Sequence, residues 1–139
     1  MPLSYIDPDE LARIIKSDKV PHKDYIVVDV RDDDYIGGNI KSSHNAPSSQ
    51  FLMNVDQLVE KTKDVPMIIF HCALSQQRGP KAARIYSETR DNLQLAGKDT
   101  DHQILVLRGG FTEFQAKFRN DPGLVENWDP DVWAAEWTS

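Results

Sequence analysis

Three short apolar runs divide this chain and restrict the folds that it can adopt. They lie at 25–30, 66–72 and 102–110, and their apolar residues are consecutive instead of alternating with polar ones. Such runs are typical of strands that are buried on both faces of a sheet. Between the runs, apolar residues recur at helical spacing. We therefore predict an α/β domain whose mainly parallel sheet is covered by helices on both faces.

Local signals place the helices between the strands. The first helix is predicted to start at Asp7, with Pro8 in its first turn and Glu10 completing a capping box. A second is predicted over 49–63, where four apolar residues recur at helical spacing: Leu52, Val55, Leu58 and Val59. A third helix opens at Gly79, and a fourth follows the last strand.

Length and composition limit the class of protein. A chain of 139 residues with 40% hydrophobic and 27% charged residues is typical of one compact globular domain, which we predict to span residues 1–139. The apolar runs are too short to cross a bilayer, and the first residues do not resemble a secretory signal. A single cysteine excludes an internal disulfide. We therefore expect a reducing compartment, cytoplasmic, nuclear or both.

The acidic balance of the chain argues against some partners. The net charge is −6, and residues 119–139 contain one basic and five acidic residues. A broad cationic surface for nucleic acid or for a membrane is therefore not expected, and any anion site must be local. His22 and His44 have no partners at metal-ligand spacing, so no metal site and no cofactor are predicted.

The only cysteine occurs in the run FHCALSQQRGP at 70–80. Cys72 follows the second strand, and Arg78 comes six residues later, where a helix opens. A loop of this kind can direct its backbone N–H groups inward, and the helix dipole adds positive potential, so the two together form an anion site. The planar fork of Arg78 can bind two oxygens of an oxyanion. The pattern thus predicts a loop that binds a phosphate-like anion.

The residues of this loop also indicate a reaction. Positive surroundings favour the thiolate of Cys72, which could attack a bound phosphate and form a cysteinyl-phosphate that water then hydrolyses. Ser75 is a candidate donor to the thiolate or the anion, and Gly79 allows close backbone approach. His71 is expected to act indirectly, from behind the loop. The competing interpretation is a half-buried core cysteine, the commoner role of a lone intracellular cysteine.

Three segments resemble one family. The stretch HCALSQQRGPKAAR is similar to the active-site loop of the rhodanese-fold phosphatases, which include the cell-division-cycle dual-specificity phosphatases and related fungal arsenate reductases. VVDVRDDDYIGGNIKSSHNAP and LRGGFTEF resemble two further elements of that family. This resemblance implies a rhodanese-like catalytic domain with a central, mainly parallel five-stranded sheet. It also implies that Asp29 and Arg31 are a structural pair.

The resemblance further assigns roles within the loop. It implies Cys72 as the nucleophile and Arg78 as the ligand of the oxyanion. The backbone amides that line the pocket would be those of Ala73, Leu74, Ser75, Gln76, Gln77 and Arg78. The cell-cycle phosphatases have carboxylates where this chain has Ala73 and Gln77, so the acid that protonates the leaving group stays open. Aryl phosphates need that acid least, because phenolate leaves more easily than alkoxide.

Four functions are considered for such a loop. The preferred one is a phosphotyrosine or dual-specificity protein phosphatase acting on a phosphoprotein. The second is an arsenate reductase, which would recruit glutathione and a glutaredoxin as electron donors. A sulfurtransferase is disfavoured because its loop is shorter than the seven residues from Cys72 to Arg78. A non-catalytic phosphate-binding module is disfavoured because both reactive residues are present.

The C-terminal segment 119–139 is acidic and contains three tryptophans: Trp128, Trp133 and Trp137. Trp133 and Trp137 are four residues apart after a helix-start signal at Asp129 and Pro130, so they share one helix face. We predict that this tail packs on the domain. The alternative is that the same face docks a protein partner.

Overall fold

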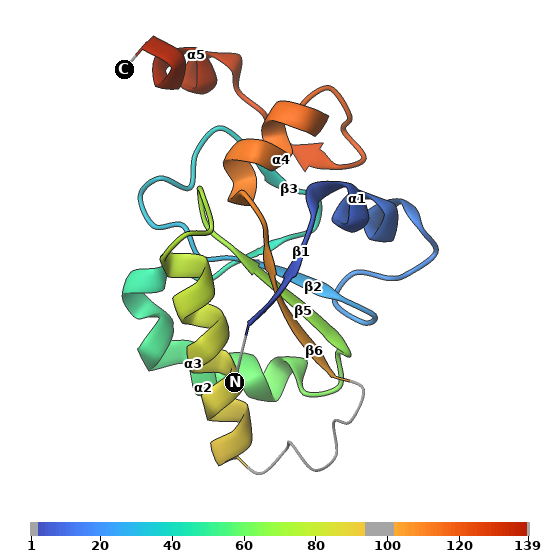
Figure 1. Cartoon of the computed structure of the whole chain (residues 1–139), viewed down its shortest axis with the longest axis vertical. Helices are drawn as coiled ribbons and strands as arrows, with labels where there is room; N and C mark the ends of the chain where they lie inside the picture. Colours follow the sequence, from blue (N-terminus) through green and yellow to red (C-terminus); the bar gives the residue numbers. More distant parts are fainter. Residues whose placement is uncertain (1–2, 94–101, 139) are drawn as a thin grey trace.

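Five parallel strands form the centre of the fold (Figure 1). The computed structural model describes residues 3–93 and 102–138, with side chains described as far as residue 134. The sheet has the order β1-β6-β5-β2-β4, and every neighbouring pair is parallel. Its strands are β1 (Ser4–Ile6), β2 (Ile26–Asp29), β4 (His44–Asn45), β5 (Met67–His71) and β6 (Gln103–Leu107). The predicted fold class is confirmed.

Helices cover both faces of this sheet, as predicted. On one face lie α2 (Phe51–Thr62) and α3 (Arg78–Asn92), and on the other lie α1 (Pro8–Lys16) and α4 (Gly110–Phe118). A short 3-10 turn, η1 (Ser48–Gln50), leads into α2. A small antiparallel pair joins β3 (Asn39–Ile40) to β7 (Val125–Glu126), and α5 (Pro130–Thr138) ends the described chain. Across residues 3–93 and 102–138, no helix has the length and apolar character that crossing a bilayer requires.

The continuous apolar runs are explained by two separate cores. Val28 belongs to the core under α2 and α3, whereas its neighbour Val27 belongs to the core under α1 and α4, and both are fully buried. Successive side chains of a strand point to opposite faces, so a strand covered on both sides has apolar residues at consecutive positions. The helix prediction was wrong at one position. Leu52 is 71% exposed, and Phe51 occupies the core in its place.

The parallel topology brings the functional segments to one rim. Asp29 at the end of β2 pairs in register with His71 at the end of β5. Strand β6 runs parallel beside β5 and leads into the Gly109–Gly110 pair. The segments that follow these three strands therefore lie together at the carboxyl edge of the sheet, which is the usual ligand site of such folds.

The first part of the C-terminal segment contacts this same region. Trp133 is 8% exposed, and its indole N–H donates to the carbonyl of Gly37 at 2.9 Å. Its ring centroid lies 5.9 Å from that of Phe111. The indole N–H of Trp128 donates to the side chain of Gln115 in α4 at 2.9 Å. The side chain of Trp137, the third tryptophan of the predicted stripe, lies outside the described residues.

Candidate active site

Cys72 lies at the centre of the rim, directly after β5. Its side chain is 3% exposed and lies against the start of α3. Gly79 makes this approach possible, because a Cβ there would lie 3.3 Å from the Cα of His71 and 3.4 Å from the backbone nitrogen of Cys72. The N-terminus of a 15-residue helix therefore lies beside the thiol. Its dipole and free N–H groups favour negative charge at this place.

The loop between Cys72 and α3 folds back toward the sulfur. The backbone N–H of Ser75 donates to the Sγ of Cys72 at 3.2 Å, and Ser75 adopts a φ of 56°, in the left-handed region. A non-glycine residue in this region is uncommon and often occurs at functional sites. The hydroxyl of Ser75 is buried and has no hydrogen-bond partner among the described residues. The side chains of Leu74, Gln76 and Gln77 are exposed, and that of Ala73 is half-buried.

The glycine pair before α4 holds the other side of the loop. The N–H of Phe111 donates to the carbonyl of Cys72 at 3.0 Å, and the N–H of Thr112 donates to that of Ala73 at 2.9 Å. Gly110 has a φ of 60°, and a Cβ there would lie only 2.4 Å from the Ala73 carbonyl oxygen. Only glycine fits, so the LRGGF segment positions α4 to bind the carbonyls of the loop. The sequence analysis did not identify this contact.

His71 lies behind the loop, where the sequence analysis expected it. It is fully buried, and its Nδ1 lies 3.0 Å from the carbonyl of Cys72, so Nδ1–H donates to this oxygen. Its Nε2 lies 3.7 Å from the Oδ2 of Asp29. Burial lowers the pKa of His71, and this effect prevails over the opposing charge of Asp29. The imidazole is therefore neutral at pH 7.

The depressed pKa of His71 predicts a pH dependence of stability. The unfolded chain, with an imidazole pKa of about 6.5, binds this proton more readily than the folded chain does. Stability is therefore fully present above about pH 6.5 and falls below it, by at most about 1.4 kcal/mol per pH unit for this one group. Urea unfolding at pH 7.5 and 5.5 should show a larger loss for the wild type than for His71→Gln. Equal losses would contradict the prediction.

A buried ion pair lies at the end of β2, next to the Cys72 loop. The Nη2 of Arg31 lies 2.7 Å from the Oδ2 of Asp29, and the two side chains are 2% and 0% exposed. Arg31 also donates to the carbonyl of Gly38 at 2.8 Å, and its guanidinium lies over the ring of Phe111 at 4.4 Å. The prediction of a structural pair at the end of the strand is confirmed. It ties the 32–38 loop to the sheet and to α4.

Arg78, the expected oxyanion ligand, is held by two carboxylates in this structure. Its Nη2 lies 2.6 Å from Asp34 Oδ2, its Nη1 lies 2.8 Å from Asp34 Oδ1, and Asp32 Oδ2 lies 3.2 Å from Nη1. The hydrogen bonds raise the pKa of Arg78 and lower that of Asp34. Although partial burial acts in the opposite direction, hydrogen bonds from Ser48 and Ser49 lower the pKa of Asp32 to about 2.

Asp32 and Asp34 were not among the predicted site residues. Their signal was the run of three aspartates directly after a strand end, on the same rim as Cys72. The Oδ2 of Asp32 is fixed by the hydroxyl of Ser48 at 2.5 Å, and its Oδ1 by the N–H of Ser49 at 2.9 Å. Asp34 accepts from the N–H of Asp32 at 2.9 Å. Asp32 and Asp34 are thus held in place by hydrogen bonds, and together they bind the guanidinium of Arg78.

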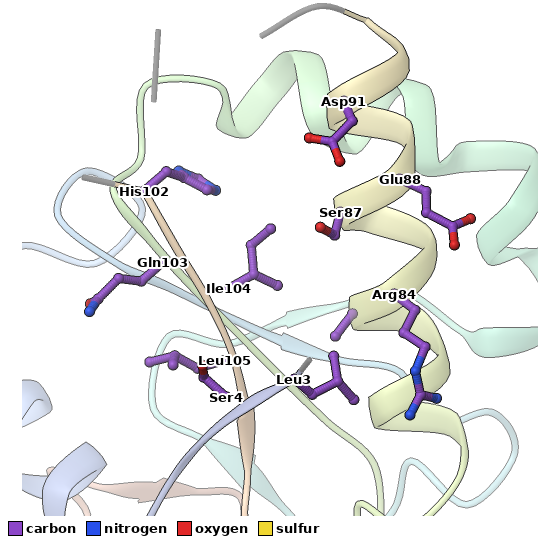
Figure 2. Close-up of a pocket in the computed structure, with 11 residues that line it drawn as sticks. Leu3, Ser4, Arg84, Ser87, Glu88, Asp91, His102, Gln103, Ile104 and Leu105 are labelled. Atoms are coloured by element: carbon purple, nitrogen blue, oxygen red, sulfur yellow. The ribbon is translucent and has the colours of Figure 1, made fainter. Parts of the chain in front are cut away.

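A cavity between α3 and the sheet edge lies away from these residues (Figure 2). It has a volume of about 530 Å³ and lies between α3 and the strands β1 and β6. Arg84 and Glu88 of α3 line one side, and Ile104 and Leu105 of β6 line the other, whereas no residue of the 72–78 loop takes part. Arg84 therefore belongs to a different part of the surface from the loop.

The comparison with protein families decides the family of this domain. The family model of the rhodanese-like domain matches residues 7–117 of this chain. The matched part includes the segment after β2, the Cys72 loop after β5 and the glycine pair after β6. The chain belongs to the rhodanese-like family. The resemblance seen in the sequence is thereby confirmed.

The relatives of this chain within the rhodanese-like family are named either as phosphatases or as arsenate reductases. A dual specificity phosphatase of Schizosaccharomyces pombe is 35% identical, over 89% of this chain and 96% of its own length. Arsenate reductase 2.2 of Oryza sativa subsp. japonica is 34% identical, over 84% of this chain and 85% of its own length. A solved structure of a yeast protein tyrosine phosphatase of the rhodanese family is 31% identical, covers 96% of this chain and 98% of its own, and has a TM-score of 0.78.

Proposed function

We propose that this chain is a cysteine-dependent protein phosphatase that acts on phosphotyrosine or has dual specificity. The observation that carries the proposal is the geometry around Cys72, whose sulfur accepts the backbone N–H of Ser75 in the loop that leads into α3. These contacts, together with the dipole of α3, favour an anion that faces the sulfur. The phosphatase names of the fungal relatives support the same reaction class.

The proposed reaction has two steps. The sulfur of Cys72 attacks phosphorus, an S–P bond forms, the P–O bond to the substrate breaks, and the leaving oxygen takes a proton. Water then attacks the cysteinyl-phosphate and releases inorganic phosphate and the thiolate. The amides of the 73–78 loop and the guanidinium of Arg78 stabilise the charge on the phosphoryl oxygens. The carbonyl contacts from α4 and His71 keep the loop in this shape.

An arsenate reductase is the second candidate function. Arsenate has the shape and charge of phosphate, so the same loop would bind it. The rice relative supports this reading, as does the absence of carboxylates at Ala73 and Gln77. In that reaction Cys72 would attack arsenic, and glutathione with a glutaredoxin would supply the electrons. A sulfurtransferase or a non-catalytic phosphate-binding module remains the third candidate.

One comparison of activities tests the proposal. The purified chain is assayed under reducing conditions for hydrolysis of a small aryl phosphate, and in parallel for arsenate reduction with glutathione and glutaredoxin. We expect hydrolysis of the aryl phosphate, and we expect added inorganic phosphate to inhibit it competitively. Arsenate reduction without phosphatase turnover would overturn the proposal in favour of the second candidate.

The carboxylates on Arg78 predict a gain of oxyanion affinity upon mutation. Asp34→Asn removes the charge that competes with the oxyanion for the guanidinium. Because this pair is partly exposed, we expect the inhibition constant of inorganic phosphate to fall by about two- to fivefold. The matched control is Asp33→Asn, since Asp33 is exposed and makes no hydrogen bond or ion pair with its side chain in the described part of the chain. Weaker phosphate binding in Asp34→Asn would instead mean that Asp34 orients Arg78 productively.

A further inference from the structure

A second, smaller cavity adjoins the catalytic loop. Its volume is about 120 Å³, and it lies between the start of α2 and the first turns of α3. The residues that line it include Ser48, Phe51, Leu52, Arg78, Lys81 and Ile85. Arg78 therefore belongs both to the wall of this cavity and to the proposed oxyanion site.

The helical period explains how α3 builds this wall. Arg78, Lys81 and Ile85 are three and four residues apart, so they lie on one face of the helix. This face starts at the oxyanion loop and continues toward an apolar position. A group that binds along this face contacts the cationic Arg78 first and the aliphatic Ile85 about two helical turns later.

The opposite wall contains an apolar side chain that the core does not use. Leu52 is 71% exposed although it directly follows Phe51, which is 4% exposed and belongs to the core. A leucine at this position contributes little to the packing of α2. It does give the cavity an apolar edge beside the catalytic arginine.

The charges of the cavity wall restrict what it can bind. Two of the residues that line it are cationic and none is acidic, and because Arg78 is already paired with Asp32 and Asp34, Lys81 supplies the charge that faces a ligand. Lys81 is exposed and forms no ion pair within the described residues. The cavity therefore suits a ligand that carries an anionic group next to an apolar one. A bare oxyanion such as arsenate would not use the apolar part.

The volume limits the apolar group to one side chain. A cavity of about 150 Å³ lined by apolar residues is large enough for one benzene molecule. A volume of about 120 Å³ therefore accommodates one aliphatic side chain of the size of Val or Leu.

We propose that this cavity is a specificity pocket for the apolar side chain of a phosphoprotein substrate, one or two residues from the phosphorylated one. This inference rests on the phosphatase function proposed above. The phosphoryl group is bound by the 72–78 loop, the neighbouring apolar side chain enters between Leu52 and Ile85, and Lys81 faces the negative charge of the substrate. The pocket thus distinguishes phosphoproteins by sequence as well as by phosphate.

Phosphotyrosine peptides test this pocket directly. A single Leu is moved through the two positions on each side of phosphotyrosine in an otherwise Ala-Gly background, with an all-Ala-Gly peptide as the reference. One position is expected to raise kcat/KM about tenfold, because a partly open pocket removes most but not all of one aliphatic side chain from water. The Leu52→Asp variant should lose this preference, measured as the ratio of kcat/KM between the Leu peptide and the all-Ala-Gly peptide, because this ratio cancels any effect of the new charge on the phosphoryl group.

The matched control is Met53→Asp. Met53 is 83% exposed in the same helical turn and does not line the cavity, so the new charge should leave the Leu preference unchanged. No Leu preference in the wild type, or a preference that survives Leu52→Asp, would overturn the pocket. A wild type without aryl phosphate turnover would instead overturn the phosphatase function. In that case, fluorescence anisotropy of the same peptides on Cys72→Ser supports the pocket if Leu tightens binding and overturns it otherwise.

Discussion

Hydrolysis of a small aryl phosphate is expected to fall at least about 10⁴-fold when Cys72 is replaced by Ser. The reaction proposed here needs an ionised nucleophile, and a serine hydroxyl is not ionised at neutral pH in these surroundings. The neighbouring Ser75 cannot replace the thiol, because its backbone N–H points at the Cys72 sulfur and the residue is buried in a left-handed conformation. Steady-state rates at matched enzyme concentration give the measurement.

A binding measurement separates loss of chemistry from loss of structure. Ser differs from Cys by one atom, and the carbonyl of residue 72 keeps its contacts with Phe111 and His71. The Cys72→Ser variant should therefore bind inorganic phosphate within a few-fold of the wild-type affinity by calorimetry. Residual turnover above about one per cent would exclude Cys72 as the nucleophile.

The second large effect is expected on stability, from Arg31→Met. This change leaves the carboxylate of Asp29 buried, with the N–H of residue 31 and the neutral His71 as its remaining polar neighbours. Breaking a buried ion pair by removing one partner typically costs about 3–5 kcal/mol. The variant also loses the hydrogen bond to Gly38 and the packing over Phe111. Urea unfolding followed by circular dichroism would show the midpoint shift at an unchanged slope.

Arg108→Met is the matched control for this experiment. Arg108 also forms an ion pair, with Asp7 at 2.9 Å, but the two side chains are 63% and 57% exposed. An exposed pair of this kind contributes less than about 1 kcal/mol. If the two variants were equally stable, the buried pair would have no special role in holding the rim.

Much of the fold was predictable because it follows from short-range patterns. The three consecutive apolar runs predicted strands covered on both faces, and the alternation of Val27 and Val28 between two cores shows why apolar residues occupy consecutive positions there. The parallel arrangement then determined that the segments after the strands share one rim. Cys72 and the glycine pair follow the neighbouring strands β5 and β6, so this topology brings them to the same edge of the sheet.

Other features depended on contacts between residues far apart in the chain. Helical spacing assigned Leu52 to the core, but α2 turns Phe51 inward and leaves Leu52 beside the pocket. The ion pairs of Arg78 with Asp32 and Asp34 join positions more than 40 residues apart. A sequence pattern reports which residues share a helix or strand face, because that depends on local periodicity. Which faces and strand ends meet is decided by packing of the whole domain, so the partners of Arg78 and the cavity beside it emerged only from the tertiary structure.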